Sequence, residues 1–284
     1  MQLSDIRITI LMDDRPSHPE MVAEHGASFW IELPEGNLVF DTGLSENTLR
    51  NSERLQVNLS SAHAIVLSHG HYDHIGGLEA ILRRIGTIPV YAHPEIFRDR
   101  YSRRSGKEHY IGVTGVEEYY RKLGAQFHWV TKPQQVLSQV WISGEIPRRT
   151  NFETVNPRFQ YRTWQAGSQS WQPDLIPDDM ALFIHTGQGV VVITGCGHSG
   201  IVNTVQYARE VTGTERIAAV IGGMHLVDAD QTRRVRTTEA LAEMEVGLLV
   251  PLHCTGEEMR ELLCQKFENR VKLFGAGDQI IFKD

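Results

Sequence analysis

The sequence predicts an α/β (α+β) protein whose two halves are built alike. In each half, apolar segments separated by turn residues predict hairpins. Further apolar segments then alternate with stretches of helical periodicity, which is the pattern of strand–helix units. Polar residues, several of them histidines, stand directly after predicted strands in both halves. These observations indicate a layered protein that carries polar side chains at its strand ends.

Composition indicates an ordinary globular chain. Its 284 residues, 41% hydrophobic and 22% charged, suffice for one large or two smaller domains. The net charge of −7, without a Lys/Arg-rich block, argues against nucleic acid as an obligatory partner. No segment resembles a signal peptide or the ~20 apolar residues that span a bilayer, and the three cysteines lack framework spacing. We therefore expect a cytoplasmic protein without a membrane partner, and its oligomeric state stays open.

Short apolar or alternating segments predict the strands of the first half, which are expected at residues 6–12, 29–33, 37–40, 64–67 and 88–92. Pro34-Glu35-Gly36 predicts the hairpin turn between the second and third of them. A helix is predicted over residues 78–85, because Leu78, Ile81, Leu82 and Ile85 have the spacing of one helix face.

From about residue 97 to 172 the periodicity loosens. We interpret this region as an insertion on the fold, because it shows no long periodic core of its own, and insertions of this kind usually shape a substrate pocket. In the second half, strands are expected at 180–184, 190–193, 217–221, 247–252, 271–274 and 279–282. Helices are expected at 201–212, 232–244 and 257–267.

The densest group of polar residues is His69-x-His71-x-Asp73-His74, which lies between the strand at 64–67 and the helix at 78–85. Neutral imidazoles and carboxylates are ligands of zinc and neighbouring metals. His69 and His71 alternate along an extended segment and can face one ion, while Asp73 and His74 can face a second. The alternative is a polar loop rich in histidine, which is a costly accident in a buried turn.

One loop cannot close two metal sites, so histidines of the second half are required. His198 and His253 each follow an apolar strand and precede a helix, as a ligand at a strand end would. His225 also ends a predicted strand, whereas His185 lies within a predicted hairpin. The structural alternative is that strand-end histidines cap helices.

The motif at residues 69–74 resembles the signature of the metallo-β-lactamase fold superfamily. Gly-Cys-x-His at 195–198 narrows the resemblance to the branch of methanopterin-pathway dihydropteroate-synthase-like proteins (7,8-dihydropterin-6-methyl-4-(β-D-ribofuranosyl)aminobenzene 5′-phosphate synthase-like). The resemblance implies one four-layer αββα sandwich over residues 1–284, with the metal residues at one edge. It also implies two divalent metals, with zinc favoured and manganese or iron as alternatives.

The resemblance assigns the ligands. His69, His71 and His198 would hold the first metal, and Asp73, His74 and His253 the second. His225 is expected to be a pocket residue or proton donor, with metal ligation as its second possibility.

Four further residues are expected around the metals by the same resemblance. Asp41 would orient the metal loop from behind the ligands, although it could instead cap the next segment. Cys196 stands where many members have a bridging Asp, and is either a thiolate ligand or a small buried core residue. His25 and Arg148 are candidates for substrate binding, Arg148 through its fork of donors, unless they are ordinary structural or surface residues.

By resemblance, the expected function is a metal-dependent hydrolase that uses a metal-activated hydroxide on a small molecule containing a phosphoester. Asp73 would orient that nucleophile, and His225 would protonate the leaving group. Three alternatives stay open: a dihydropterin–aminobenzene ribofuranosyl phosphate synthase-like transferase, a lactonase- or thioesterase-type acyl hydrolase, and a non-catalytic metal-dependent ligand sensor.

Overall fold

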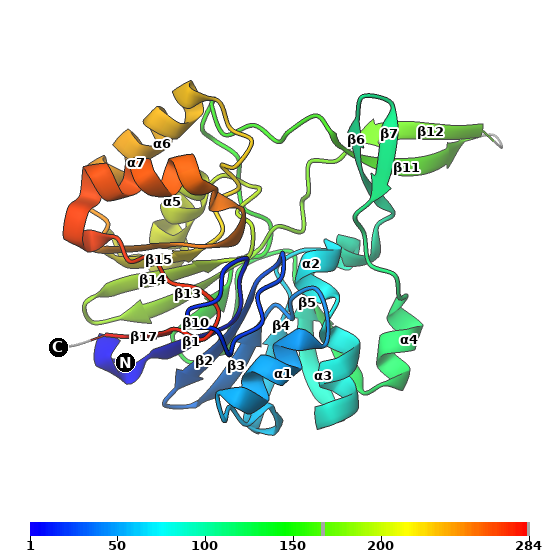
Figure 1. Cartoon of the computed structure of the whole chain (residues 1–284), viewed down its shortest axis with the longest axis horizontal. Coiled ribbons are helices and arrows are strands. Elements are labelled where there is room, and N and C mark those ends of the chain that lie inside the picture. Colours follow the sequence, from blue (N-terminus) through cyan, green and yellow to red (C-terminus); the bar gives the residue numbers. More distant parts are fainter. Residues whose placement is uncertain (166–167, 283–284) are drawn as a thin grey trace.

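The computed structural model describes residues 1–165 and 168–282. Two β-sheets are stacked face to face, and helices cover their outer faces (Figure 1). This arrangement confirms the predicted αββα sandwich. None of the helices within the described ranges has the length and apolar character needed to cross a membrane.

The first sheet has seven strands in the order β17-β1-β2-β3-β4-β5-β8. In chain order these are β1 (Arg7–Met12), β2 (Ser28–Leu33), β3 (Gly36–Phe40), β4 (Ala62–Val66), β5 (Ile88–Ala92), β8 (Ala125–Trp129) and β17 (Gln279–Ile281). The last strand therefore pairs with the first, and the two ends of the chain lie close together (Figure 1). The strand expected at 271–274 is not formed, because Val271 makes only an isolated bridge to Leu249.

The second sheet has six strands in the order β16-β15-β14-β13-β10-β9. They are β9 (Gln134–Leu137), β10 (Val140–Ile142), β13 (Ala181–Thr186), β14 (Gly189–Thr194), β15 (Ile217–Gly222) and β16 (Leu248–Pro251). The three strands β14, β15 and β16 run parallel to one another. Their carboxyl ends therefore lie at one edge of the sheet, where His198, His225 and His253 follow them in the sequence.

A third sheet, which we call the small sheet, projects from the sandwich (Figure 1). Its strands are β6 (Arg100–Arg104), β7 (Lys107–Tyr110), β11 (Phe159–Gln165) and β12 (Ser168–Pro173). The region that the sequence analysis treats as one insertion is thus divided in the structure. Strand β8 extends the first sheet and strands β9 and β10 extend the second, while the small sheet stands apart from both.

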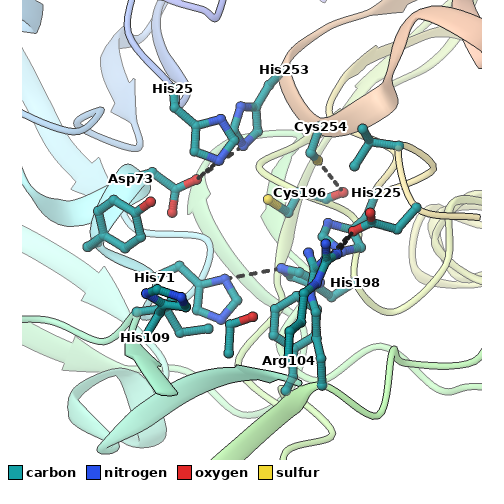
Figure 2. A pocket seen from close by; sticks show the side chains of 17 residues that line it. His25, His71, Asp73, Arg104, His109, Cys196, His198, His225, His253 and Cys254 are labelled. Atoms are coloured by element: carbon teal, nitrogen blue, oxygen red, sulfur yellow. Dashed lines mark hydrogen bonds and ion pairs between the residues drawn. The ribbon is translucent and has the colours of Figure 1, made fainter. Parts of the chain in front are cut away.

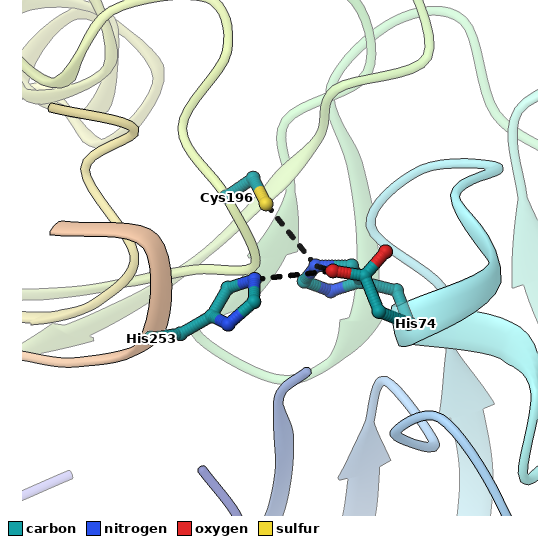
Figure 3. A group of neighbouring side chains, drawn as sticks. His74, Cys196 and His253 are labelled. Carbon is teal, nitrogen blue, oxygen red and sulfur yellow. Dashed lines mark hydrogen bonds and ion pairs between the residues drawn. The ribbon is translucent and has the colours of Figure 1, made fainter. Parts of the chain in front are cut away.

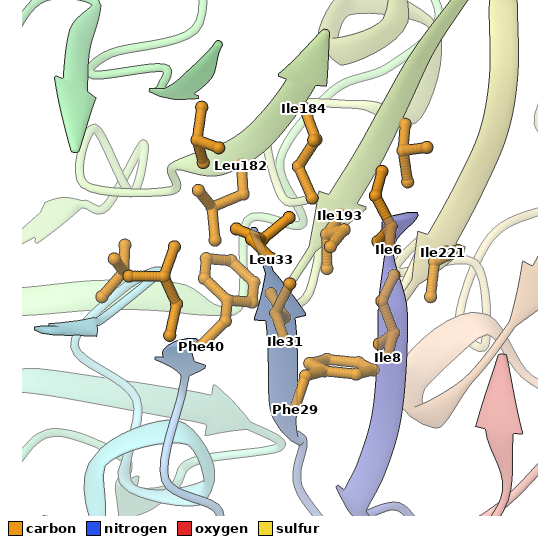
Figure 4. Close-up of a cluster of buried hydrophobic side chains, with 14 of the residues drawn as sticks. Ile6, Ile8, Phe29, Ile31, Leu33, Phe40, Leu182, Ile184, Ile193 and Ile221 are labelled. Carbon is orange, nitrogen blue, oxygen red and sulfur yellow. The ribbon is translucent and has the colours of Figure 1, made fainter. Parts of the chain in front are cut away.

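The alternation of side chains along the strands builds three apolar layers. In β2, Phe29 and Ile31 point between the two large sheets, while Trp30 points to the outer face. In β13, Leu182 points inward and Phe183 outward. Side chains of both large sheets form the inner layer (Figure 4), and their packing sets how the two sheets are aligned.

Besides five short 3-10 helices, seven α-helices lie in the described part of the chain. They are α1 (Asn47–Arg54), α2 (Tyr72–Ile75), α3 (Leu78–Ile85), α4 (Glu117–Lys122), α5 (Ile201–Thr212), α6 (Gln231–Glu243) and α7 (Glu257–Phe267). Side chains of α3 pack on the first sheet and those of α5, α6 and α7 on the second. The helices predicted at 78–85, 201–212, 232–244 and 257–267 are therefore all present.

Candidate metal centre

Three imidazoles form a first group of donors where β4 and β14 end. His69 Nε2 lies 3.0 Å from His71 Nδ1. His198 Nε2 lies 3.3 Å from the same atom (Figure 2). All three rings are buried, and burial lowers the pKa of each imidazole well below its ordinary value. Three neutral rings that each direct a nitrogen toward one point can also present their lone pairs to a metal ion there. The donor set therefore fits a metal ion.

A second group consists of Asp73, His74, Cys196 and His253, all buried, with one donor atom of each within 4.8 Å of the others. Cys196 Sγ lies 3.1 Å from His74 Nε2, and Asp73 Oδ2 lies 3.3 Å from His253 Nε2. Figure 3 shows these side chains converging from separate segments of the chain. The two groups together contain all six residues that the sequence predicts as ligands. They add Cys196, whose sulfur lies within 4.8 Å of the other donor atoms of the second group.

The Asp41 carboxylate is linked by hydrogen bonds to a histidine ring of each group. Its carboxylate accepts hydrogen bonds from His74 Nδ1 at 2.7 Å and from the Ser68 hydroxyl at 2.6 Å. The Ser68 Oγ atom in turn lies 2.9 Å from His69 Nδ1. One buried carboxylate thus fixes a ring in each group, as expected for Asp41. A Cβ atom on Gly195 would lie 2.2 Å from the Ser68 hydroxyl, so only glycine fits beside this contact.

Asp14, which follows β1, contacts two histidines of the site and was not predicted from the sequence. Its Oδ1 atom lies 2.5 Å from His253 Nδ1, and its Oδ2 atom lies 3.0 Å from His25 Nδ1. Although burial opposes ionisation, these contacts hold the pKa of Asp14 below its ordinary value. His25, expected in substrate binding, lies against the second group, with Nε2 3.4 Å from Asp73 Oδ2 (Figure 2). The acidic pair Asp13-Asp14, which directly follows a predicted strand, could have indicated from the sequence that this position belongs to the site.

A buried ion-pair network supports the metal loop from the side of the small sheet. Arg100, which is fully buried, donates to Asp178 at 2.6 and 2.7 Å and to Asp174 at 2.8 Å. Asp178 Oδ2 also accepts a hydrogen bond from the Gly70 amide at 2.7 Å. Gly70 stands between His69 and His71, so this network fixes the backbone that presents the first group. None of these partners shows a recognisable local motif in the sequence.

Arg148, predicted to bind substrate, does not line the cavity beside the metal groups. Its guanidinium donates to the carbonyl oxygens of His198 at 2.6 Å and Leu175 at 2.5 Å. It therefore contacts the turn that carries His198, and backbone carbonyl groups engage one N–H of each of its two terminal nitrogens. A single sequence shows that an arginine is present but not that carbonyl groups will face it.

A cavity of about 410 Å³ opens above both groups (Figure 2). Its lining includes His71, Asp73, Cys196, His198 and His253 on the metal side. The residues that line the rest of it are His25, Tyr72, Ser102, Arg104, His109, Ile111, Arg158, Phe159, His225, Val227, Asp228 and Cys254. A cavity of this size suits a small molecule.

His225 lines this cavity beside His198, with the two ring centroids 4.1 Å apart. Both ring nitrogens are buried and have no hydrogen-bond partner within the described part of the protein. The same ring also lies near the sulfurs of Cys196 and Cys254, within 4.8 Å. His225, His253 and Asp41 all have positive φ angles of 44°, 46° and 58°. Such strained non-glycine backbone concentrates at functional sites, and here three instances surround one centre.

Comparison with known proteins shows what this chain is similar to. Residues 22–211 match the sequence profile of the Metallo-beta-lactamase superfamily. The chain is 31% identical over 293 residues to the 7,8-dihydropterin-6-methyl-4-(beta-D-ribofuranosyl)-aminobenzene-5'-phosphate synthase of Methanocaldococcus jannaschii, an alignment that covers 99% of this chain and 98% of that protein. The crystal structure of Tm1679, a metal-dependent hydrolase of the beta-lactamase superfamily, superimposes with a TM-score of 0.83 and 28% identity, covering 98% of this chain and 100% of that one.

Proposed function

The chain belongs to the metallo-β-lactamase superfamily, and from this premise we propose that it is a metal-dependent hydrolase of a small molecule containing a phosphoester. The observation that carries the proposal is the pair of donor groups at the floor of one cavity. Two adjacent groups suit the clamp that stabilises both the attacking and the leaving oxygen of a phosphoryl displacement.

His69, His71 and His198 would hold one divalent ion, and Asp73, His74, His253 and Cys196 a second. Imidazole, carboxylate and thiolate together favour zinc, with iron as an alternative, and they suit manganese less because it prefers oxygen ligands. Bound metals of this kind polarise a phosphoryl oxygen and lower the pKa of water from 15.7 to about 7.

The chain's own residues would then complete the reaction. Asp73 lines the cavity and its carboxylate can accept a hydrogen bond from the attacking water, which orients that water toward the substrate. His225 has two ring nitrogens without partners among the described residues and can donate a proton to the leaving oxygen. Asp41 and Asp14 hold the imidazoles of His74 and His253 in position during these steps.

A second candidate is a transferase like the methanogen synthase, and its specific support is the 31% identity over nearly the whole length of both chains. Such an enzyme would join a dihydropterin diphosphate to an aminobenzene ribofuranosyl phosphate. The amine would replace water as the nucleophile, and diphosphate would leave. The same cavity and the same metal groups would serve this reaction.

One set of assays separates the candidates. The zinc-loaded protein is expected to hydrolyse bis-p-nitrophenyl phosphate, and His71→Ala to lose that activity. Diphosphate release only when both pterin and amine substrates are supplied would support the synthase instead. Hydrolysis confined to a panel of lactones and thioesters would indicate an acyl hydrolase. Tight ligand binding without turnover on any panel would indicate a sensor, and both of the last two results would contradict the proposal.

A further inference from the structure

We propose that Arg104 and Arg158 form a subsite for a phosphate group of the substrate, distinct from the reacting bond at the metal groups. This inference rests on the proposed function and narrows its substrate class. The substrate would be a small molecule that carries a phosphate monoester in addition to the bond that is broken.

Both arginines come from the small sheet and its flank, and both line the cavity. Their guanidiniums converge on one acceptor, Asp228 Oδ2, which Arg104 Nη2 contacts at 2.9 Å and Arg158 Nη1 contacts directly. Two cations share one carboxylate, so this wall of the cavity keeps a positive charge. Arginine presents five N–H donors, and Asp228 engages only one from each side chain.

Arg158 has a further donor free. Its Nε atom is buried and has no hydrogen-bond partner within the described residues, and its side chain is only 17% exposed. The Nε atoms of Arg103, Arg209, Arg233 and Arg260 are also buried without a hydrogen-bond partner among the described residues, but of these five arginines only Arg158 lines the cavity. The position is therefore suited to an anion that enters the cavity.

The Phe159 ring contacts both the proposed subsite and two histidines of the first metal group. The Arg158 guanidinium stacks over Phe159 at 4.6 Å from the ring centroid. The same ring lies 5.5 Å from His71 and 5.3 Å from His198, centroid to centroid. A substrate can therefore place a phosphate on the arginines while its reacting bond lies over the metal groups.

The chemistry favours a phosphate dianion over a carboxylate. A carboxylate, that of Asp228, already occupies the arginines, so an entering ligand must compete with it. A phosphate dianion offers three acceptor oxygens and twice the charge, and two guanidinium forks can bind it in bidentate fashion.

Arg103 provides a matched control, because it neighbours Arg104 on the same strand and does not line the cavity. Its guanidinium donates to Gln160 Oε1 at 2.8 Å and stacks over Trp171 at 4.4 Å. Arg103→Gln removes a similar charge from the small sheet and leaves the proposed subsite intact.

The test is calorimetric binding of phenylphosphonate, whose P–C bond is not hydrolysed, to the zinc-loaded protein. Arg104→Gln and Arg158→Gln are each expected to raise Kd roughly 10- to 100-fold, and Arg103→Gln to leave it unchanged. Asp228→Asn is expected to lower Kd, because it removes the competing carboxylate. If Asp228 served only to clamp the small sheet, Asp228→Asn would weaken binding as the arginine variants do.

Two results would overturn the inference: equal Kd values for wild type and both arginine variants, or weaker binding by Asp228→Asn. The first would mean that the phosphonate binds at the metals alone. Hydrolysis of bis-p-nitrophenyl phosphate, which lacks a phosphate monoester, is measured on the same preparations. If the wild type does not hydrolyse this compound, the proposed function is refuted. If the arginine variants bind phenylphosphonate as tightly as the wild type, only the subsite is refuted.

Discussion

Replacing Asp178 by Asn tests whether the buried ion-pair network supports the metal loop. The substitution keeps the shape of the side chain but removes its charge. Two of the three hydrogen bonds that Arg100 makes to carboxylates end on Asp178, at 2.6 and 2.7 Å. Arg100 would then remain buried with only Asp174 to balance it.

The expected loss is large. Each hydrogen bond to a charged group contributes about 1.5–3 kcal/mol, and breaking one partner of a buried ion pair costs about 3–5 kcal/mol. We therefore expect Asp178→Asn to lower the free energy of unfolding by about 3–5 kcal/mol. Because the Gly70 amide also donates to Asp178, we expect weaker zinc binding by His69 and His71 as well.

Asp99→Asn is the matched control, since Asp99 accepts two hydrogen bonds from Arg162 at 2.6 and 2.9 Å. That pair is exposed by 31% and 39%, so solvent screens it and its loss should cost far less than that of the buried pair. Urea unfolding at a fixed zinc concentration measures both variants, because bound metal itself stabilises the fold. A loss below about 1 kcal/mol for Asp178→Asn, with zinc affinity unchanged, would refute the reasoning.

Three other perturbations have equally definite outcomes. Asp41→Asn, in which asparagine tolerates the positive φ angle, should weaken zinc binding roughly 10- to 100-fold in a competition assay with a chelator; an unchanged affinity would show that Asp41 does not orient the ligands. His225→Asn should lower kcat for bis-p-nitrophenyl phosphate by about 10²–10⁴ at unchanged metal content, whereas loss of metal would make His225 a ligand. Because burial lowers the pKa of His69, His71 and His198, these rings should stay neutral and keep their metal as the pH falls to about 6.5, the ordinary histidine value. In a pH titration, release above that value of the zinc held by His69, His71 and His198 would contradict the pKa direction, whereas the pKa values of His74 and His253 in the second group are raised and do not bear on it.

The sequence predicted the parts of the fold that depend on local pattern. Strand β5 at 88–92 and helix α5 at 201–212 have the predicted bounds, because apolar periodicity alone determines which face they bury. The small sheet was not predicted. Its strands carry mostly polar residues, as in Arg100–Arg104 and Lys107–Tyr110, so hydrophobic alternation gave no signal for them.

The residues of the site likewise fall into those that local sequence pattern predicts and those that it does not. The donors at strand ends were predicted because histidines and an aspartate stand together in one motif or follow apolar strands. Asp14 and the pair Arg104 and Arg158 were missed, since their roles arise from contacts between segments far apart in the chain. Arg148 was assigned to substrate by the family resemblance and its fork of donors, whereas in the structure it donates to the carbonyl oxygen of His198.

Metal content measured by mass spectrometry tests the central claim most directly. Wild-type protein purified without added metal is compared with His71→Ala and with His63→Ala, a control for an exposed histidine on strand β4. We expect about two divalent ions per chain in the wild type and in His63→Ala, and a clear loss in His71→Ala. Wild-type protein that holds no metal even after reconstitution, or His71→Ala that keeps the full content, would contradict the account.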